Sequence, residues 1–255
     1  MGMTWKAGRA VLAVATMLLA AACVTTRDLE YESEDAFEKL RNEAKISANG
    51  RERAYVNCVS RAIILELPAP YAELDWDIEV FVEPDANAFA MMGGKIGVNT
   101  GLFDVAGNQD QLAAVIGHEI AHVTEKHQLT RANSTIAIGA GAQVLGAVTG
   151  TGSMGSGTAG MLGQLGLLLP FTRGQESEAD VIGLRYMAAA GFDPRQSVKL
   201  WQNMQKANKG GPPQFLSTHP SPDNRIDSLV GMFPETLKLY NDARAAGKTP
   251  QCTPP

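Results

Sequence analysis

The chain has 255 residues, of which 45% are apolar and 19% charged, so it can bury a sizeable core and is too apolar for a disordered chain. A net charge of −5 argues against a nucleic-acid-binding surface as the main function. Three cysteines exclude a small disulfide-dense domain.

The first 22 residues are predicted to be a signal peptide. Two basic residues precede an apolar run over 10–22, which is shorter than the ~20 residues that a membrane-spanning helix needs. The run ends in Leu-Ala-Ala-Ala-Cys, which resembles the lipobox of bacterial lipoproteins, except that Ala20 replaces the usual Leu. This resemblance implies a lipidated Cys23 and an outer-membrane lipoprotein facing the periplasm. The alternative is an ordinary secretory signal and a soluble periplasmic protein.

Export changes how charge and cysteines are interpreted. Cleavage before Cys23 removes two basic residues and no acidic one, which takes the net charge from −5 to −7. The remaining cysteines, Cys58 and Cys252, would then meet an oxidising compartment. We therefore hypothesise a Cys58–Cys252 bridge that ties the C-terminal tail to an N-terminal helix.

The first part of the mature chain predicts two helices and a small sheet. Helical spacing over 28–67 is interrupted at Asn49-Gly50, which indicates two helices. Alternation over 77–83 predicts a strand with Ile78, Val80 and Val82 on one face. One or two further short strands are expected around a glycine turn, within 87–90 and 95–99.

The rest of the chain is expected to be mainly helical and to complete one compact domain spanning 23–255. The predicted helices cover 109–130, 174–190 and 194–206, with a short helical stretch near 222–245.

The sharpest chemical signal is His118-Glu-Ile-Ala-His122 in the helix over 109–130. Residues i and i+4 share a helix face, so both histidines can offer a ring nitrogen to one zinc ion. Glu119 lies about 100° around the helix from His118. There it can accept a proton from water that the zinc ion has made more acidic.

Three carboxylates on the helix over 174–190 are candidates for a third ligand. Glu176 and Asp180 share a face, whereas Glu178 points about 200° away from Glu176. One of the paired carboxylates can bind zinc while the other accepts the free N–H of a ligand histidine. Glu176 is favoured as the ligand, and Glu178 is the alternative.

These motifs together resemble the zinc metallopeptidase family that includes the HtpX-type and CAAX prenyl proteases. The resemblance covers about residues 75–230 and adds His219-Pro-Ser-Pro-Asp-Asn-Arg225-Ile to the two helical motifs. It implies an α+β fold: a mostly helical, zincin-like domain with a small sheet beside the active-site helix. It also implies one Zn²⁺ per chain, with Glu176 as the third ligand and Asp180 as a proton donor or a partner of a ligand histidine.

Three further residues lie near these motifs, and the resemblance implies that His219 is close to the metal. His219 is expected either to stabilise an oxyanion, to bind zinc as a fourth ligand in a closed state, or simply to cap a helix. Arg225 is expected to form a structural ion pair. His127 falls about 140° from the face of His122, so a surface position is predicted.

Two segments are candidates for substrate or membrane contact. The strand at 87–90 resembles the family's segment beside the cleft, where an extended peptide can add as a further strand; otherwise it is a plain hairpin. Residues 132–172 carry no charge and are rich in glycine. They are predicted to form two buried or amphipathic helices with a Gly/Ser loop that can act as a lid, or alternatively to contact the membrane.

The resulting functional hypothesis is a zinc endopeptidase of the bacterial cell envelope that cleaves misfolded or unassembled proteins. Its partners would be protein substrates and, through Cys23, the membrane, with no nucleic acid. The alternative is a chaperone-like protein that assists outer-membrane protein assembly and holds clients in the same cleft.

Overall fold

The computed structural model describes residues 24–137, 170–207, 214–220 and 224–255. The predicted signal peptide, Cys23 and most of the uncharged segment lie outside the described residues. The proposed lid and membrane contact of that segment therefore stay predictions.

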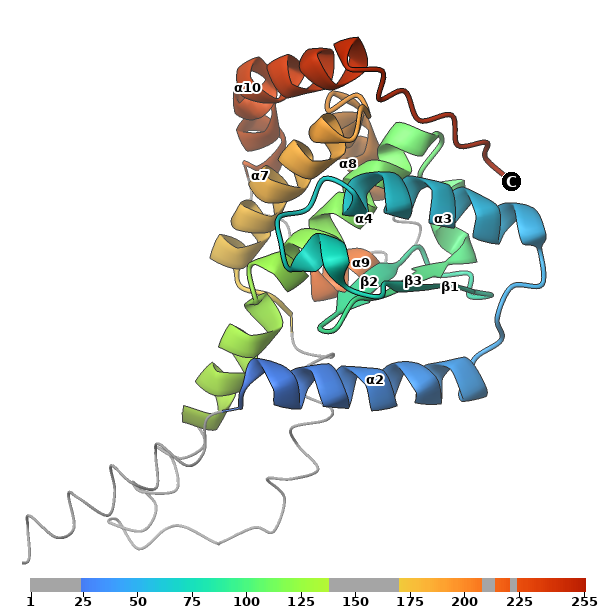
Figure 1. Cartoon of the computed structure of the whole chain (residues 1–255), viewed down its shortest axis with the longest axis vertical. Coiled ribbons are helices and arrows are strands. Elements are labelled where there is room, and N and C mark those ends of the chain that lie inside the picture. Colours follow the sequence, from blue (N-terminus) through green and yellow to red (C-terminus); the bar gives the residue numbers. More distant parts are fainter. Residues whose placement is uncertain (1–23, 138–169, 208–213, 221–223) are drawn as a thin grey trace, which may run out of the picture.

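The domain is mostly helical and α+β, as predicted (Figure 1). In chain order its elements are α2 (Thr26–Glu43), α3 (Gly50–Ile64), η1 (Tyr71–Glu73), β1 (Asp77–Phe81), β2 (Ala88–Met91), β3 (Lys95–Asn99), η2 (Thr100–Asp104), α4 (Gln109–Thr124), α7 (Arg173–Ala189), α8 (Gln196–Lys206), α9 (Gln214–Thr218) and α10 (Arg225–Ala245). Three of these, η1, η2 and α9, are short helical elements that were not predicted. The stretch expected to be briefly helical near the C-terminus is a helix of 21 residues.

The sheet has three strands in the order β1-β3-β2. β3 runs parallel to β1 and antiparallel to β2, with which it forms a hairpin. Gly93 and Gly94 in the hairpin turn have φ values of 78° and 81°, a region that L-residues with a side chain rarely adopt. This arrangement leaves β2 at an edge of the sheet.

Both faces of the sheet are covered, which corrects the single apolar face predicted for β1. Val80 faces the main core, whereas Phe81 packs on the opposite face against Phe37 of α2. Val82 lies beyond the strand and is 36% exposed. In Figure 1 the sheet accordingly lies between α2 and the layer formed by α3 and α4.

Helix α4 is the central element of the helical layer and is buried on nearly every side. Its first turn is capped by Asn108, whose side chain accepts a hydrogen bond from the backbone N–H of Gln111. α3, α7, α8 and β2 all pack against it (Figure 1). Side chains that α4 projects in any direction are therefore shielded from water.

The predicted continuous helix over 109–130 is wrong at its C-terminal end. α4 stops at Thr124, and Lys126 has a φ of 55°, after which residues 127–137 form a separate helical segment. Since the chain changes direction at this turn, helical angles counted across it do not hold. The consequence for His127 is described below.

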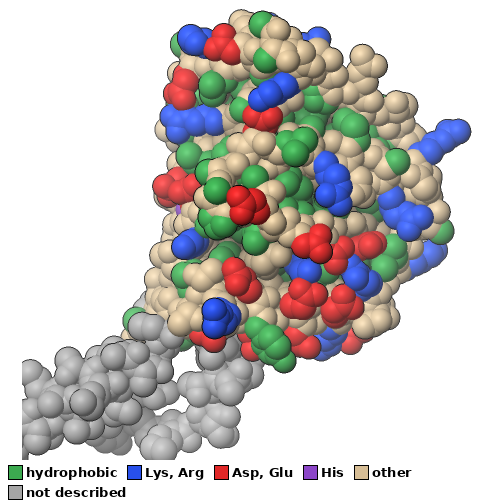
Figure 2. Space-filling view, viewed as in Figure 1, with side chains coloured by type: hydrophobic (Ala, Val, Ile, Leu, Met, Phe, Trp, Pro, Cys, Tyr) green, Lys and Arg blue, Asp and Glu red, His purple; other side chains and the backbone are tan. Residues whose placement is uncertain are grey.

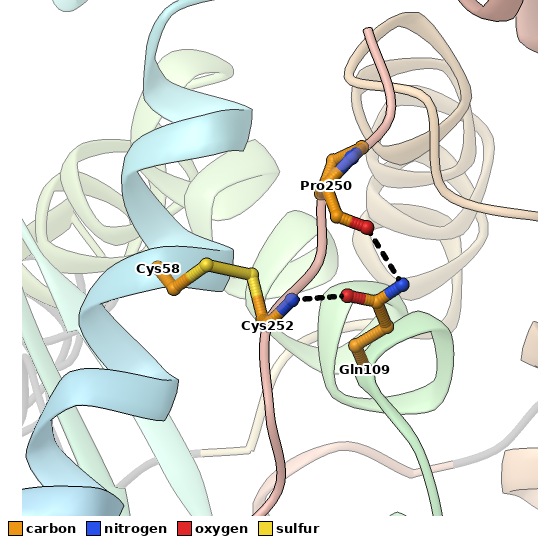
Figure 3. Close-up of a disulfide and its surroundings, with 4 residues drawn as sticks. All are labelled: Cys58, Gln109, Pro250 and Cys252. Carbon is orange, nitrogen blue, oxygen red and sulfur yellow. Dashed lines mark hydrogen bonds between the residues drawn. A yellow bond between two sulfur atoms is a disulfide. The ribbon is translucent and has the colours of Figure 1, made fainter.

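The hypothesised bridge between Cys58 and Cys252 is confirmed (Figure 3). It joins α3 to the C-terminal tail across 194 residues of sequence. The tail is also held by Gln109 at the start of α4. The Gln109 amide donates to the carbonyl of Pro250 at 3.0 Å and accepts from the N–H of Cys252 at 2.7 Å. The tail thus fastens α3 to the base of α4.

Replacing both Cys58 and Cys252 with Ser is expected to lower the free energy of unfolding by about 2–5 kcal/mol, because the bridge closes a long loop in the unfolded chain. Urea denaturation of oxidised wild type, reduced wild type and the double variant measures this effect. Reduced wild type is the control and should match the variant. Equal midpoints for the oxidised and reduced forms would contradict a stabilising bridge.

The surface carries charges of both signs. In the view of Figure 2 acidic side chains are most crowded in the lower part of the molecule, where α2 lies, and basic side chains are interspersed among them. Among the described residues, none of the helices combines the length and the apolar character that crossing a membrane requires.

Candidate metal centre

Four side chains predicted from sequence to surround a metal ion meet in the core. His118 and His122 come from α4, Glu176 from α7, and His219 follows α9. One ligand atom from each can be chosen so that all four lie within 4.8 Å of one another, and all four residues are buried. Histidine nitrogens with one carboxylate are the donor set of catalytic zinc sites, so these residues fit the expected ion.

Close contact between α4 and α7 brings the ligands together. Gly117 of α4 and Gly183 of α7 face each other: a Cβ on Gly117 would lie 2.7 Å from the carbonyl oxygen of Gly183. A Cβ on Gly183 would lie 2.6 Å from the backbone nitrogen of His118. Because neither position has a side chain, the helix backbones approach directly beside the first histidine.

His118 is oriented by Asp180, one turn after Glu176 on α7. Asp180 Oδ1 lies 3.0 Å from His118 Nδ1. The other ring nitrogen, Nε2, lies 3.1 Å from His122 Nε2 and 3.5 Å from Glu176 Oε2. This is the geometry that a partner of a ligand histidine requires, and it favours that role for Asp180 over proton donation to a substrate.

Arg225 forms the ion pairs expected of it. Its Nε donates to Asp180 Oδ2 and a terminal nitrogen donates to Glu176 Oε2, both at 2.6 Å. The guanidinium lies 3.9 Å from the ring centre of Trp201, and the whole residue is buried. Arg225 therefore links the two carboxylates and compensates their negative charge in the core.

One ring nitrogen of His122 faces the cluster, and its other ring nitrogen faces His127. Nε2 lies 3.5 Å from Glu176 Oε1, whereas Nδ1 lies 2.8 Å from His127 Nδ1. The surface position predicted for His127 is wrong: the turn at Lys126 folds it back into the core behind His122. Phe171 stacks on the His122 ring at 3.7 Å between centroids.

Glu119 is buried next to the four ligand candidates. Its Oε1 lies 3.3 Å from His219 Nε2 and makes no hydrogen bond within the described part of the chain. The backbone of Ala90 in β2 hydrogen-bonds the carboxylate. Glu119 thus presents a free carboxylate oxygen between the cluster and the edge strand.

His219 is inside the cluster rather than at its rim. Its Nδ1 lies 3.0 Å from Glu176 Oε1 and 3.3 Å from His118 Nε2. Phe215, one turn earlier, stacks on the ring with 4.4 Å between centroids. Its position is compatible with a fourth ligand and with a group that contacts a bound substrate.

The protonation of the cluster follows from burial and mutual contacts. Burial lowers the pKa of His122 well below its ordinary value, so this imidazole is neutral. Burial also acts to raise the pKa of Glu176, but its close contacts with the three histidines outweigh burial and hold the pKa far below its usual range. A neutral imidazole and an ionised carboxylate are the forms that bind metal.

His118 and Glu119 have raised pKa values for different reasons. Burial acts to lower the pKa of His118, but its bonds with Asp180 and Glu176 prevail and raise it to about 10. A metal ion at His118 must therefore displace a proton. For Glu119, burial is the main cause of the raised pKa, which brings the carboxylate closer to the range of an effective general base.

Glu178, the alternative third ligand, does not reach the cluster. Its side chain is 57% exposed and lies 3.2 Å from His127 Nε2, on the far side of His122. The arrangement supports Glu176 as the ligand.

A pair of conservative variants tests this assignment. Glu176→Gln is expected to lower zinc affinity by at least about 100-fold, since a direct ligand contributes more than the groups that orient it. Glu178→Gln keeps a hydrogen-bond acceptor and is expected to stay within a few-fold of wild type. Competition with a chromophoric chelator measures both, with circular dichroism as a check on folding. Full zinc retention in Glu176→Gln would overturn the assignment.

Comparison with known proteins agrees with this site. Residues 50–232 match the model of peptidase family M48. The chain is 37% identical over 188 residues to the mitochondrial metalloendopeptidase OMA1 of Schizosaccharomyces pombe. This match covers 71% of this chain and 53% of the relative. It is 38% identical over 152 residues to the beta-barrel assembly-enhancing protease of Yersinia pestis, covering 55% of this chain and 31% of the relative.

The chain thus spans about half or less of the length of these relatives. The matched residues nevertheless include both helical motifs and His219. The chain belongs to peptidase family M48, a family of zinc-dependent metallopeptidases.

Proposed function

We propose that this chain is a zinc endopeptidase that cleaves proteins in the bacterial cell envelope. The observation that carries the proposal is the buried set of His118, His122 and Glu176 with the carboxylate of Glu119 beside it. A purely structural zinc site does not need such a carboxylate, whereas hydrolysis needs a base.

In the proposed mechanism His118, His122 and Glu176 hold the zinc ion. When bound, zinc acts as a Lewis acid that polarises a carbonyl oxygen and makes water more acidic. Glu119 accepts the proton of the attacking water and later delivers it to the nitrogen of the leaving amine. Asp180, held by Arg225, keeps the His118 ring oriented.

Two roles remain open for His219 in this scheme. As a fourth ligand it would close the site, and its removal would weaken zinc binding. As a donor to the developing oxyanion it would affect turnover and leave zinc affinity unchanged. Zinc titration and peptide cleavage by His219→Ala separate the two roles.

Substrate is proposed to lie along the edge strand β2. The backbone of Ala90 in this strand contacts Glu119, and because its carbonyl already accepts from Gln128 at 2.9 Å, a peptide would pair with other residues of β2. A peptide that adds beside β2 would therefore pass next to the proposed base. Recognition through main-chain hydrogen bonds suits an enzyme that accepts many unfolded sequences.

The protein is proposed to be a lipoprotein of the outer membrane, anchored at Cys23 and facing the periplasm. Support comes from the lipobox-like sequence. It also comes from relatives that carry the name beta-barrel assembly-enhancing protease, in Yersinia pestis and Escherichia coli. A soluble periplasmic protein is the alternative, and metabolic labelling with a fatty acid, compared between wild type and Cys23→Ala, distinguishes them.

The proposed substrates are misfolded or unassembled envelope proteins, and the rival function is chaperone-like binding of the same clients. Comparing protein N-termini in envelopes of cells that carry wild type or Glu119→Gln tests the choice. New N-termini that depend on Glu119 support proteolysis. Rescue of envelope integrity by Glu119→Gln, without such N-termini, would support the binding function instead.

A further inference from the structure

His127 and Glu178 extend from His122 towards the surface, on the side away from the metal-ligand cluster. The Nδ1 atoms of His122 and His127 are 2.8 Å apart, and both residues are buried. The opposite nitrogen of His127, Nε2, lies 3.2 Å from Glu178 Oε2. The three side chains form a continuous line of polar contacts that ends at an exposed carboxylate.

The direction of the protons along this line follows from the geometry. His122 Nε2 points into the cluster, 3.1 Å from His118 Nε2, so it must be unprotonated to bind a metal ion. A neutral imidazole then carries its proton on Nδ1. That proton is donated to His127 Nδ1, which leaves the proton of His127 on Nε2, where it is donated to the carboxylate of Glu178.

We propose that His127 and Glu178 are positioning residues that fix the tautomer and ring orientation of His122 for zinc binding. Neither touches the ion or the substrate. The inference rests on the proposed zinc site but not on peptide cleavage.

The two metal-ligand histidines of α4 are thereby oriented by different groups from the same helix. Asp180 contacts His118 directly and is buried with Arg225. Glu178, two residues earlier on α7, points to the other side and reaches His122 only through His127. The turn at Lys126 makes this possible, because in an uninterrupted helix His127 would lie about 140° from His122.

A pair of substitutions at His127 separates hydrogen bonding from simple filling of space. In His127→Asn the side-chain oxygen can take the place of Nδ1 as acceptor, whereas His127→Leu retains bulk without an acceptor. We expect His127→Leu to lower zinc affinity about 10–100-fold, as loss of a group that orients a ligand does, and His127→Asn to recover most of this loss. Chelator competition on the full chain measures the affinities.

A matched pair at the exposed end provides variants that keep the core intact. Glu178→Ala removes the acceptor for His127 Nε2 and is expected to lower zinc affinity several-fold, while Glu178→Gln retains an acceptor and stays near wild type. Glu235→Ala in α10 is the control, since its described side-chain hydrogen bonds are with Arg185 and not with His127.

The tautomer itself can be read from ¹⁵N NMR of the histidine rings in the zinc-free protein. We expect a proton on Nδ1 of His122 in wild type and in His127→Asn, and a loss of this preference in His127→Leu. Equal zinc affinity in His127→Leu and His127→Asn, or an unchanged His122 tautomer in both, would overturn the proposal. If His127→Leu does not fold, the Glu178 variants decide: equal zinc affinities of Glu178→Ala and Glu178→Gln would overturn the proposal.

A different experimental result would refute the proposed enzymatic function. Wild type that binds zinc with the expected His122 tautomer, yet cleaves no unfolded protein, would refute the endopeptidase and leave the positioning role standing.

Discussion

Glu119→Gln is expected to abolish cleavage of unfolded protein while zinc stays bound. Gln has nearly the same shape as Glu but cannot accept a proton from water, and loss of a general base slows a reaction by about 10²–10⁴-fold. The proposed ligands His118, His122 and Glu176 are unchanged by this substitution. The measurements are kcat/KM on a denatured protein substrate and zinc content after gel filtration.

The burial of Glu119 makes zinc content an essential control. Its Oε1 is buried and forms no hydrogen bond with described residues, so the substitution removes no described hydrogen bond at this oxygen. A variant that loses both zinc and activity would indicate structural damage and leave the role of Glu119 undecided until refolding with zinc restores the ion. A variant that retains zinc and cleaves at the wild-type rate would refute the proposed base.

The local motifs of this site could be predicted because each one depends on spacing within a single helix. His118 and His122 share a face of α4, and Glu176 and Asp180 share a face of α7, in any helix that contains those sequences. The small sheet was also predictable, since alternating side chains and paired glycines define strands and a turn. Elements that satisfy such local rules formed where they were expected.

The position of His127 could not be predicted in the same way. The angular argument assumed that one helix continues past Glu125, but the chain turns at Lys126, a residue type that gives no turn signal. Because His127 was placed at the surface, the sequence did not reveal the described hydrogen-bond partner of His122 Nδ1 or the role now proposed for Glu178.

The packing of α4 on α7 likewise depends on contacts that no single helix reveals. Gly117 and Gly183 each interrupt a good helical pattern at some cost in helix propensity. In the sequence each of them is an isolated glycine within a helix. Their contact with each other is visible only in the structure. Their contact places the carboxylates of Glu176 and Asp180 within reach of His118.

Gly183→Ala is therefore expected to damage the metal centre although residue 183 touches no ligand side chain. The added Cβ would lie 2.6 Å from the backbone nitrogen of His118 and 2.7 Å from the backbone carbon of Gly117, so the two helices must separate. Overpacking of this kind costs about 1–3 kcal/mol of stability. Because Glu176 and Asp180 move with α7, we also expect zinc affinity to fall by at least about tenfold.

Gly231→Ala in α10 is the matched control for this prediction. It is the same substitution within a helix, but a Cβ at Gly231 meets no atom within 4 Å, so only helix propensity changes. This variant is expected to be more stable by about 0.5–1 kcal/mol, with zinc affinity unchanged. Thermal unfolding with and without zinc, together with chelator competition, measures both variants.

If Gly183→Ala behaved like Gly231→Ala, the contact between the two helix backbones would not determine the geometry of the site. If it lost stability but bound zinc normally, the positions of the α7 carboxylates would not depend on this contact between the helix backbones.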